Sequence, residues 1–193
     1  MHLNIPNLLT LFRIAMIPVF IGIYYVSDAS IGLHYKHVIG AAIFWLASIT
    51  DYLDGYLARK LNQHSAFGAF LDPVADKLMV AAALILLVSF RQLDPSIAFI
   101  IIGREIAISA LREWMAKLGE SKSTAVSMLG KVKTTFQMLA LLFLLYHEKL
   151  LGVDTALVGT WLIDLAALLT LWSMVYYLML ARQGIARNGG GNN

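Results

Sequence analysis

The sequence predicts an all-α integral membrane protein, a bundle of six transmembrane helices. Hydrophobic residues make up 59% of the 193 residues and charged residues only 14%. Soluble domains are about half apolar and about a quarter charged. The mean hydropathy is +0.72, and six stretches approach the roughly 20 apolar residues that a helix needs to cross a bilayer. The sequence has no cysteine, which excludes disulfides, thiolate nucleophiles and cysteine-type zinc sites.

The six stretches follow one another with mostly short connections, which predicts antiparallel neighbours. The first contains Pro18, which predicts a kink, and Arg13. The side chain of Arg13 either snorkels to the inner face or enters the polar site, and we favour snorkelling. The fifth is short unless its helix begins nearer residue 125, and the sixth is long enough to tilt. We expect one domain over 1–182 and a disordered Gly- and Asn-rich tail at 183–193. The predicted helices are approximately 8–25, 38–58, 71–90, 96–116, 131–146 and 156–181.

Lysine and arginine residues are distributed unequally between the two ends of these helices. With the amino terminus inside, nine fall on the inner side and three on the outer side, so the positive-inside rule predicts that both termini are cytoplasmic. The net charge of +3 and the pI of about 9.2 suit a face that meets anionic lipids or phosphorylated substrates. The inner set is Arg59, Lys60, Arg112, Lys117, Lys122, Lys131, Lys133, Arg182 and Arg187, and the outer set is Lys36, Arg91 and Lys149.

Four aspartates stand close together in the sequence, at the inner ends of the second and third predicted helices. Asp51 and Asp54 are three residues apart, and Asp72 and Asp76 are four apart, so each pair shares one face of its helix. Four carboxylates next to apolar surroundings require a cation. Oxygen donors that converge in this way favour Mg²⁺ or Mn²⁺, and two such ions could clamp a phosphoryl group during an in-line displacement.

Structural roles are the alternative for these carboxylates taken singly. Asp72 precedes Pro73 and could be an N-cap with proline at the first helical position. Asp51 or Asp76 could pair with Arg59 or Lys77.

Small residues flank the carboxylates and have two readings. Gly55, Ala58 and Gly68 would let a bulky ligand approach the backbone, or would allow close helix packing. The fork of Arg59 suits a phosphate, although a positive-inside charge is expected there in any case.

The full segment resembles the signature of the CDP-alcohol phosphatidyltransferases, with every fixed position present. It reads Asp51-x-x-Asp54-Gly55-x-x-Ala58-Arg59, then eight residues, then Gly68-x-x-x-Asp72-x-x-x-Asp76. The resemblance implies six transmembrane helices, a homodimer in the membrane, and transfer of a phosphatidyl group from a CDP-lipid to an alcohol with release of CMP.

The resemblance also implies roles for individual residues. Asp51, Asp54 and Asp72 would hold two divalent ions, Mg²⁺ or Mn²⁺, against the diphosphate. Asp76 would be the general base for the acceptor hydroxyl and would also touch the second ion. Asn7 and Thr10 would reach the nucleotide from the first helix, or else only cap that helix. The implied CDP-lipid contacts are Asn7, Thr10, Asp51, Asp54, Gly55, Ala58, Arg59, Ser65 and Gly68.

Other stretches of the sequence narrow the choice of the acceptor alcohol. NIPNLLTLFRIAMIPVF, GREIAISALREWMA and GKVKTTFQM resemble the bacterial branch of this family whose acceptor is glycerol 3-phosphate, in the synthesis of phosphatidylglycerol and cardiolipin. The cations expected to bind the acceptor phosphate are Arg104, Arg112, Lys131 and Lys133. Arg104 interrupts an apolar run, where an unpaired charge is costly, and its structural alternative is a pair with Glu105 or a salt bridge between helices.

Two alternatives remain open from the sequence, one within the same family and one in a different class of function. The same chemistry could use inositol phosphate, serine or phosphatidylglycerol as the acceptor. A divalent-cation transporter could use the four aspartates as an intramembrane site, although their position near one face and the lack of an inverted repeat disfavour it. For the leading hypothesis we expect CDP-diacylglycerol and glycerol 3-phosphate as substrates, no nucleic-acid partner, and a multi-pass location in the bacterial inner membrane with the active site facing the cytoplasm.

Overall fold

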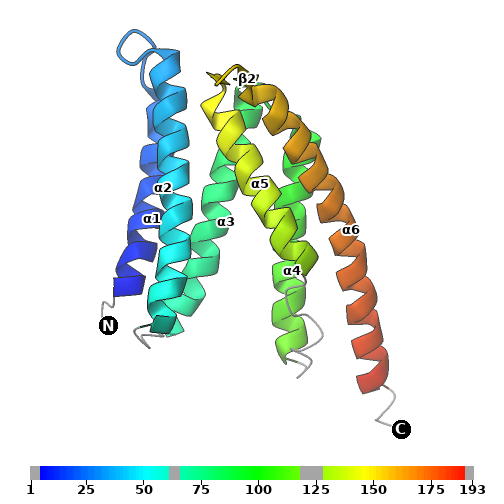
Figure 1. The fold of residues 1–193 in the computed structure, drawn as a ribbon. Helices are drawn as coiled ribbons and strands as arrows, with labels where there is room; N and C mark the ends of the chain where they lie inside the picture. Colours follow the sequence, from blue (N-terminus) through cyan, green and yellow to red (C-terminus); the bar gives the residue numbers. More distant parts are fainter. Residues whose placement is uncertain (1–4, 61–65, 118–127, 190–193) are drawn as a thin grey trace. The chain divides into compact units, whose positions relative to one another are not determined.

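A computed structural model of the chain describes residues 5–60, 66–117 and 128–189. The described residues form six α-helices and one short hairpin (Figure 1). The hairpin, which the sequence analysis did not predict, pairs β1 (Lys149–Leu150) with β2 (Val153–Asp154). The helices are α1 (Ile5–Tyr25), α2 (Leu33–Lys60), α3 (Ala66–Ser89), α4 (Pro95–Lys117), α5 (Met128–Tyr146) and α6 (Thr155–Gly189).

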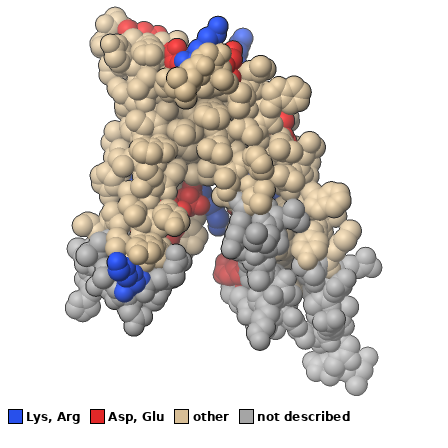
Figure 2. All heavy atoms as spheres, in the orientation of Figure 1, with Lys and Arg blue, Asp and Glu red and all other residues tan. Residues whose placement is uncertain are grey.

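All six predicted helices are confirmed. Each begins earlier than expected, and α2, α4 and α6 also end later. The predicted tail at 183–193 overlaps the end of α6, and its last part, 190–193, lies outside the described residues. Among the described helices, three are long and apolar enough to cross a membrane, over Asn7–Tyr25, Leu33–Leu57 and Thr155–Met179, and Val132–Tyr146 is a shorter apolar helix. Uncharged side chains form most of the surface visible in Figure 2. These features identify a multi-pass, all-α membrane protein.

The chain separates into two compact units. The first contains Met1–Leu93 and Ala140–Thr160, and the second contains Asp94–Leu139 and Trp161–Asn193. Within the first unit, α1 contacts both α2 and α3, and α2 contacts α3. The short connection between α1 and α2 makes these two helices antiparallel (Figure 1).

Aromatic packing holds α1 against α2. The rings of Phe20 and Phe44 are both buried, with centroids 6.5 Å apart. Tyr24 lies against Gly40, where an added Cβ would come within 2.1 Å of the tyrosine Oη. A side chain at this position would push the helices apart, so the glycine permits their close approach.

The helix boundaries decide between two readings of the Asp-Pro dipeptides. Because α3 begins at Ala66, Asp72 and Pro73 lie inside the helix, and the N-cap reading of Asp72 is wrong. That role belongs instead to Asp94, which precedes Pro95, the first residue of α4. Its Oδ1 accepts a hydrogen bond from the backbone N of Ser96 at 2.8 Å, as an N-cap carboxylate does.

Candidate active site

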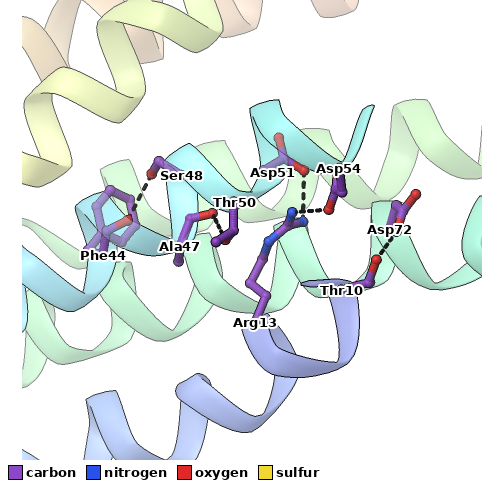
Figure 3. A network of polar contacts seen from close by, with 9 residues as sticks. All are labelled: Thr10, Arg13, Phe44, Ala47, Ser48, Thr50, Asp51, Asp54 and Asp72. Carbon is purple, nitrogen blue, oxygen red and sulfur yellow. Dashed lines mark hydrogen bonds and ion pairs between the residues drawn. The ribbon is translucent and has the colours of Figure 1, made fainter. Parts of the chain in front are cut away.

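Arg13 connects α1 to the carboxylates of α2. Its Nη1 lies 2.7 Å from Oδ1 of Asp51, and its Nη2 lies 2.5 Å from Oδ2 of Asp54 (Figure 3). The side chains of Arg13 and Asp54 are 1% and 3% exposed, whereas Asp51 is 43% exposed. A buried guanidinium is tolerated here because charged hydrogen bonds to two carboxylates compensate for its lost hydration.

Thr10 connects α1 to the third helix. Its hydroxyl donates a hydrogen bond to Oδ1 of Asp72 on α3 (Figure 3). Asn7, Thr10 and Arg13 recur every three residues and are all buried, so they form one polar face of α1. Thr10 therefore does more than cap its helix, and it meets an aspartate of the signature.

The expectation that Arg13 snorkels to the membrane face is wrong. The guanidinium turns inward because two carboxylates of α2 lie within reach, and their charge stabilises it more than a partly hydrated interface would. The signal in the sequence was the spacing with Asn7 and Thr10, which places three polar side chains on one helix face. The alternative pairing of Asp51 with Arg59 is not tested, because the side chain of Arg59 lies outside the described residues.

Asp76, Gly55 and Gly68 lie on the same helices as these carboxylates. Asp76 is half-buried on α3, one turn after Asp72, and Gly68 is buried one turn before it. Beyond the local backbone, no atom of the described residues lies within 4 Å of the point where a Cβ on Gly55 would stand. Close packing against the described residues therefore does not account for Gly55, and the space beside it is compatible with a ligand. Of the other CDP-lipid positions, Ser65 and the side chains of Ala58 and Arg59 lie outside the described residues.

The carboxylates have the chemistry of a divalent-metal site, but they are engaged with α1. Across 5–60, 66–117 and 128–189, no three His, Cys, Asp or Glu side chains gather so as to hold one ion. A carboxylate oxygen of each accepts a hydrogen bond from a side chain of α1, in Asp51, Asp54 and Asp72. Carboxylate oxygens suit Mg²⁺ or Mn²⁺, and the guanidinium shows that the place accommodates positive charge. Convergence on a shared ion stays a prediction.

A second polar network lies within the other unit. Oε1 of Glu105 on α4 accepts hydrogen bonds from Nη1 of Arg104 at 3.1 Å and from Nζ of Lys133 on α5 at 2.6 Å. Nη2 of Arg104 donates to Oγ of Ser173 on α6 at 3.1 Å, and its guanidinium lies 5.9 Å from the ring centre of Tyr177. The predicted pair of Arg104 with Glu105 is therefore present.

Two of the four predicted acceptor cations belong to this network. Arg104 and Lys133 are 6% and 1% exposed, so they are far more buried than a role in lipid-headgroup contact would require. The side chains of Arg112 and Lys131 lie outside the described residues.

The fold and the site define a multi-pass α-helical membrane protein with an acidic cluster on two neighbouring helices. The chain belongs to the CDP-alcohol phosphatidyltransferase family, whose family model matches residues 3–183.

Several relatives are similar over nearly the whole chain. Proteins of Salmonella typhimurium and Escherichia coli K12 are 50% identical over 186 residues, and one of Shigella flexneri is 49% identical. Each alignment covers 94% of this chain and 97% of the relative. All three relatives are named CDP-diacylglycerol–glycerol-3-phosphate 3-phosphatidyltransferase.

Proposed function

We propose that this protein transfers the phosphatidyl group of CDP-diacylglycerol to glycerol 3-phosphate, which gives phosphatidylglycerophosphate and CMP. The observation that carries the proposal is the 50% identity, over nearly the full length of both chains, to enzymes named for this reaction. The acidic signature is intact, and α1 contacts it through Thr10 and Arg13. The reaction belongs to the synthesis of anionic phospholipids.

The carboxylates of α2 and α3 would hold the divalent ions. Asp51, Asp54 and Asp72, with Asp76, would bind two ions, Mg²⁺ or Mn²⁺, whose charge stabilises the diphosphate and the departing CMP. The polar face of α1 keeps these carboxylates oriented through Thr10, and the open space beside Gly55 leaves room for the nucleotide. The proposed CDP-lipid contacts are Asn7, Thr10, Asp51, Asp54, Gly55, Ala58, Arg59, Ser65 and Gly68.

Asp76 is the proposed general base. Its carboxylate takes the proton of a glycerol 3-phosphate hydroxyl as that oxygen attacks the phosphatidyl phosphorus. The new P–O bond forms on one side while the bond to the CMP oxygen breaks on the other. The proposed contacts of the dianionic acceptor are Arg104, Arg112, Lys131 and Lys133, of which Arg104 and Lys133 are buried and paired with Glu105.

The proposed location is the bacterial inner membrane, where the protein would act as a homodimer with both termini and the active site facing the cytoplasm. The nine-to-three distribution of lysine and arginine between the two sides supports this orientation. It puts the carboxylates on the side where soluble glycerol 3-phosphate is available.

An acceptor panel tests the function. Purified protein is given CDP-diacylglycerol labelled in the nucleotide, with glycerol 3-phosphate, inositol phosphate, serine or phosphatidylglycerol, first with Mg²⁺ or Mn²⁺ and then with a chelator. Of the four acceptors, we expect only glycerol 3-phosphate to cause CMP release from CDP-diacylglycerol. The chelator should abolish that release. CMP release with another acceptor would show that the acceptor is not glycerol 3-phosphate alone. Uptake of Mn²⁺ by proteoliposomes without any lipid product would support a transporter instead.

A further inference from the structure

The side chain of Arg13 supplies the carboxylates of α2 with a counter-ion from the protein itself. The guanidinium is 1% exposed and bonds Asp51 Oδ1 and Asp54 Oδ2 with two different nitrogens (Figure 3). Such a two-point pair fixes both carboxylates in one orientation. One of their two negative charges is thus balanced by the protein itself.

The same two carboxylates belong to the signature that would hold the ions. While the guanidinium is bound, the described residues contain no set of three ligands ready for one ion. A divalent ion placed beside Asp51 and Asp54 would be repelled by the guanidinium and would compete for the same carboxylates. A divalent ion that takes Asp51 Oδ1 and Asp54 Oδ2 can bind only if the guanidinium moves away from them.

We propose that Arg13 is a displaceable internal counter-ion that occupies the carboxylates of Asp51 and Asp54 until a divalent ion replaces it. The proposal rests on the proposed function, which requires a divalent ion at these carboxylates. Arg13 is then a positioning residue, since it sets the orientation and the metal affinity of the groups that do the chemistry.

Two features of α1 suit such an exchange. Nε of Arg13 is buried and has no hydrogen-bond partner in the part of the chain that the structure describes, so the two carboxylates hold the guanidinium through its terminal nitrogens. Thr10, almost one turn earlier on α1, bonds Asp72. The contact between α1 and α3 through Thr10 therefore does not depend on the Arg13 pair, and α1 stays anchored when the guanidinium leaves.

Direct metal binding tests the proposal without any lipid substrate. Metal-free protein in detergent is titrated with Mn²⁺, and free Mn²⁺ is measured by electron paramagnetic resonance for the wild type, Arg13→Met and Arg13→Lys. Removal of a competing charge should tighten Mn²⁺ binding by about tenfold or more in Arg13→Met. Arg13→Lys keeps the charge but loses the two-point guanidinium contact. Its Mn²⁺ affinity should lie between those of the wild type and Arg13→Met.

Thermal unfolding provides the second readout. In chelator, Arg13→Met should melt at a lower temperature than the wild type, because two carboxylates lose their counter-ion. Addition of Mn²⁺ should restore the melting temperature of the variant. Lys36→Met is the matched control, because Lys36 is also a buried cation of this unit, paired with Asp28 at 2.5 Å near the other end of α2. It should lower stability without changing Mn²⁺ affinity.

Equal or weaker Mn²⁺ binding in both Arg13 variants would overturn the proposal, because a purely structural arginine predicts that result. If Arg13→Met does not fold, the affinity of Arg13→Lys decides alone. A wild type that shows the expected Mn²⁺ exchange but releases no CMP with any acceptor would refute the proposed function and leave the counter-ion role intact.

Discussion

The hydroxyl of Thr10 on α1 donates a hydrogen bond to Oδ1 of Asp72 on α3. This bond joins a buried side chain of the first helix to a signature aspartate 62 residues later in the sequence. Together with the Arg13 pair, it means that α1 contacts carboxylates from both helices of the acidic segment. The first helix therefore contacts the candidate site directly and is not only a membrane anchor.

Replacement of Thr10 by valine keeps the shape of the side chain and removes the donor. A hydrogen bond to a charged group contributes about 1.5–3 kcal/mol, so we expect kcat/KM for CDP-diacylglycerol to fall by about tenfold or more. Thr160→Val is the control, since the Thr160 hydroxyl donates a hydrogen bond to the backbone carbonyl of Ala156 within the same helix, at 2.8 Å. Equal effects of the two variants would contradict a role for the Thr10–Asp72 bond.

Substitution of Gly55 distinguishes a glycine that faces a ligand from one that allows close helix packing. Beyond the local backbone, no described atom lies within 4 Å of a Cβ added at Gly55. Gly55→Ala should therefore leave the melting temperature unchanged or raise it slightly, because alanine stabilises a helix by roughly 1 kcal/mol relative to glycine. KM for CDP-diacylglycerol should rise, and more so in Gly55→Leu. Gly22→Ala on α1, which also meets no described atom within 4 Å, should keep KM unchanged. Loss of stability in Gly55→Ala would instead indicate helix packing.

The helices and the family could be predicted from the sequence, because both depend on information that is local in the chain. Apolar runs set the six helices, and fixed spacings carry the signature at Asp51 to Asp76. The partner of Arg13 is not local. Whether an arginine inside a span turns to the interface or to the interior depends on which charges the neighbouring helix presents, and only the fold supplies Asp51 and Asp54.

The β1–β2 hairpin could not be predicted from the sequence for a different reason, which is local. Its two turn residues, Leu151 and Gly152, have φ values of 51° and 85°. Positive φ at both central positions is typical of a type I′ turn, which usually begins with Asn, Asp or Gly. A leucine at the first position gives no such signal, because the left-handed conformation costs it about 1–2 kcal/mol.

Glu148, between α5 and the hairpin, links stability to pH. A hydrogen bond with Nδ1 of His34 at 3.0 Å, together with the nearby histidines, lowers the pKa of Glu148 below its ordinary value of 4.5. The folded pKa lies below the unfolded one, so this stabilisation is present above pH 4.5 and is lost as the pH falls through the folded pKa. Glu148→Gln should lower the melting temperature at pH 6 and flatten its decline on acidification, and His34→Gln should do the same. An unchanged acid profile in both variants would refute the link.

Lys133 tests the acceptor site. Lys133→Met keeps a long apolar side chain but removes the cation proposed to bind the acceptor phosphate, so we expect KM for glycerol 3-phosphate to rise by about tenfold or more. KM for CDP-diacylglycerol should change little. Lys149→Met, on the exposed strand β1, is the control and should leave both constants unchanged. A parallel rise in both KM values would show that Lys133 maintains the structure and does not select the acceptor.

Asp76 provides the sharpest test of the chemistry. Asp76→Asn keeps the size of the side chain and removes the basic oxygen, so transfer should fall by the about 10²–10⁴-fold that general base catalysis contributes. The variant should fold, since Asp76 is only half-buried on α3. Mn²⁺ titration separates its two proposed roles, because loss of a base leaves Mn²⁺ affinity unchanged and loss of a ligand weakens it. Asp164→Asn, also a half-buried aspartate inside a helix, is the control and should retain activity. Full transfer in Asp76→Asn would show that another group removes the acceptor proton.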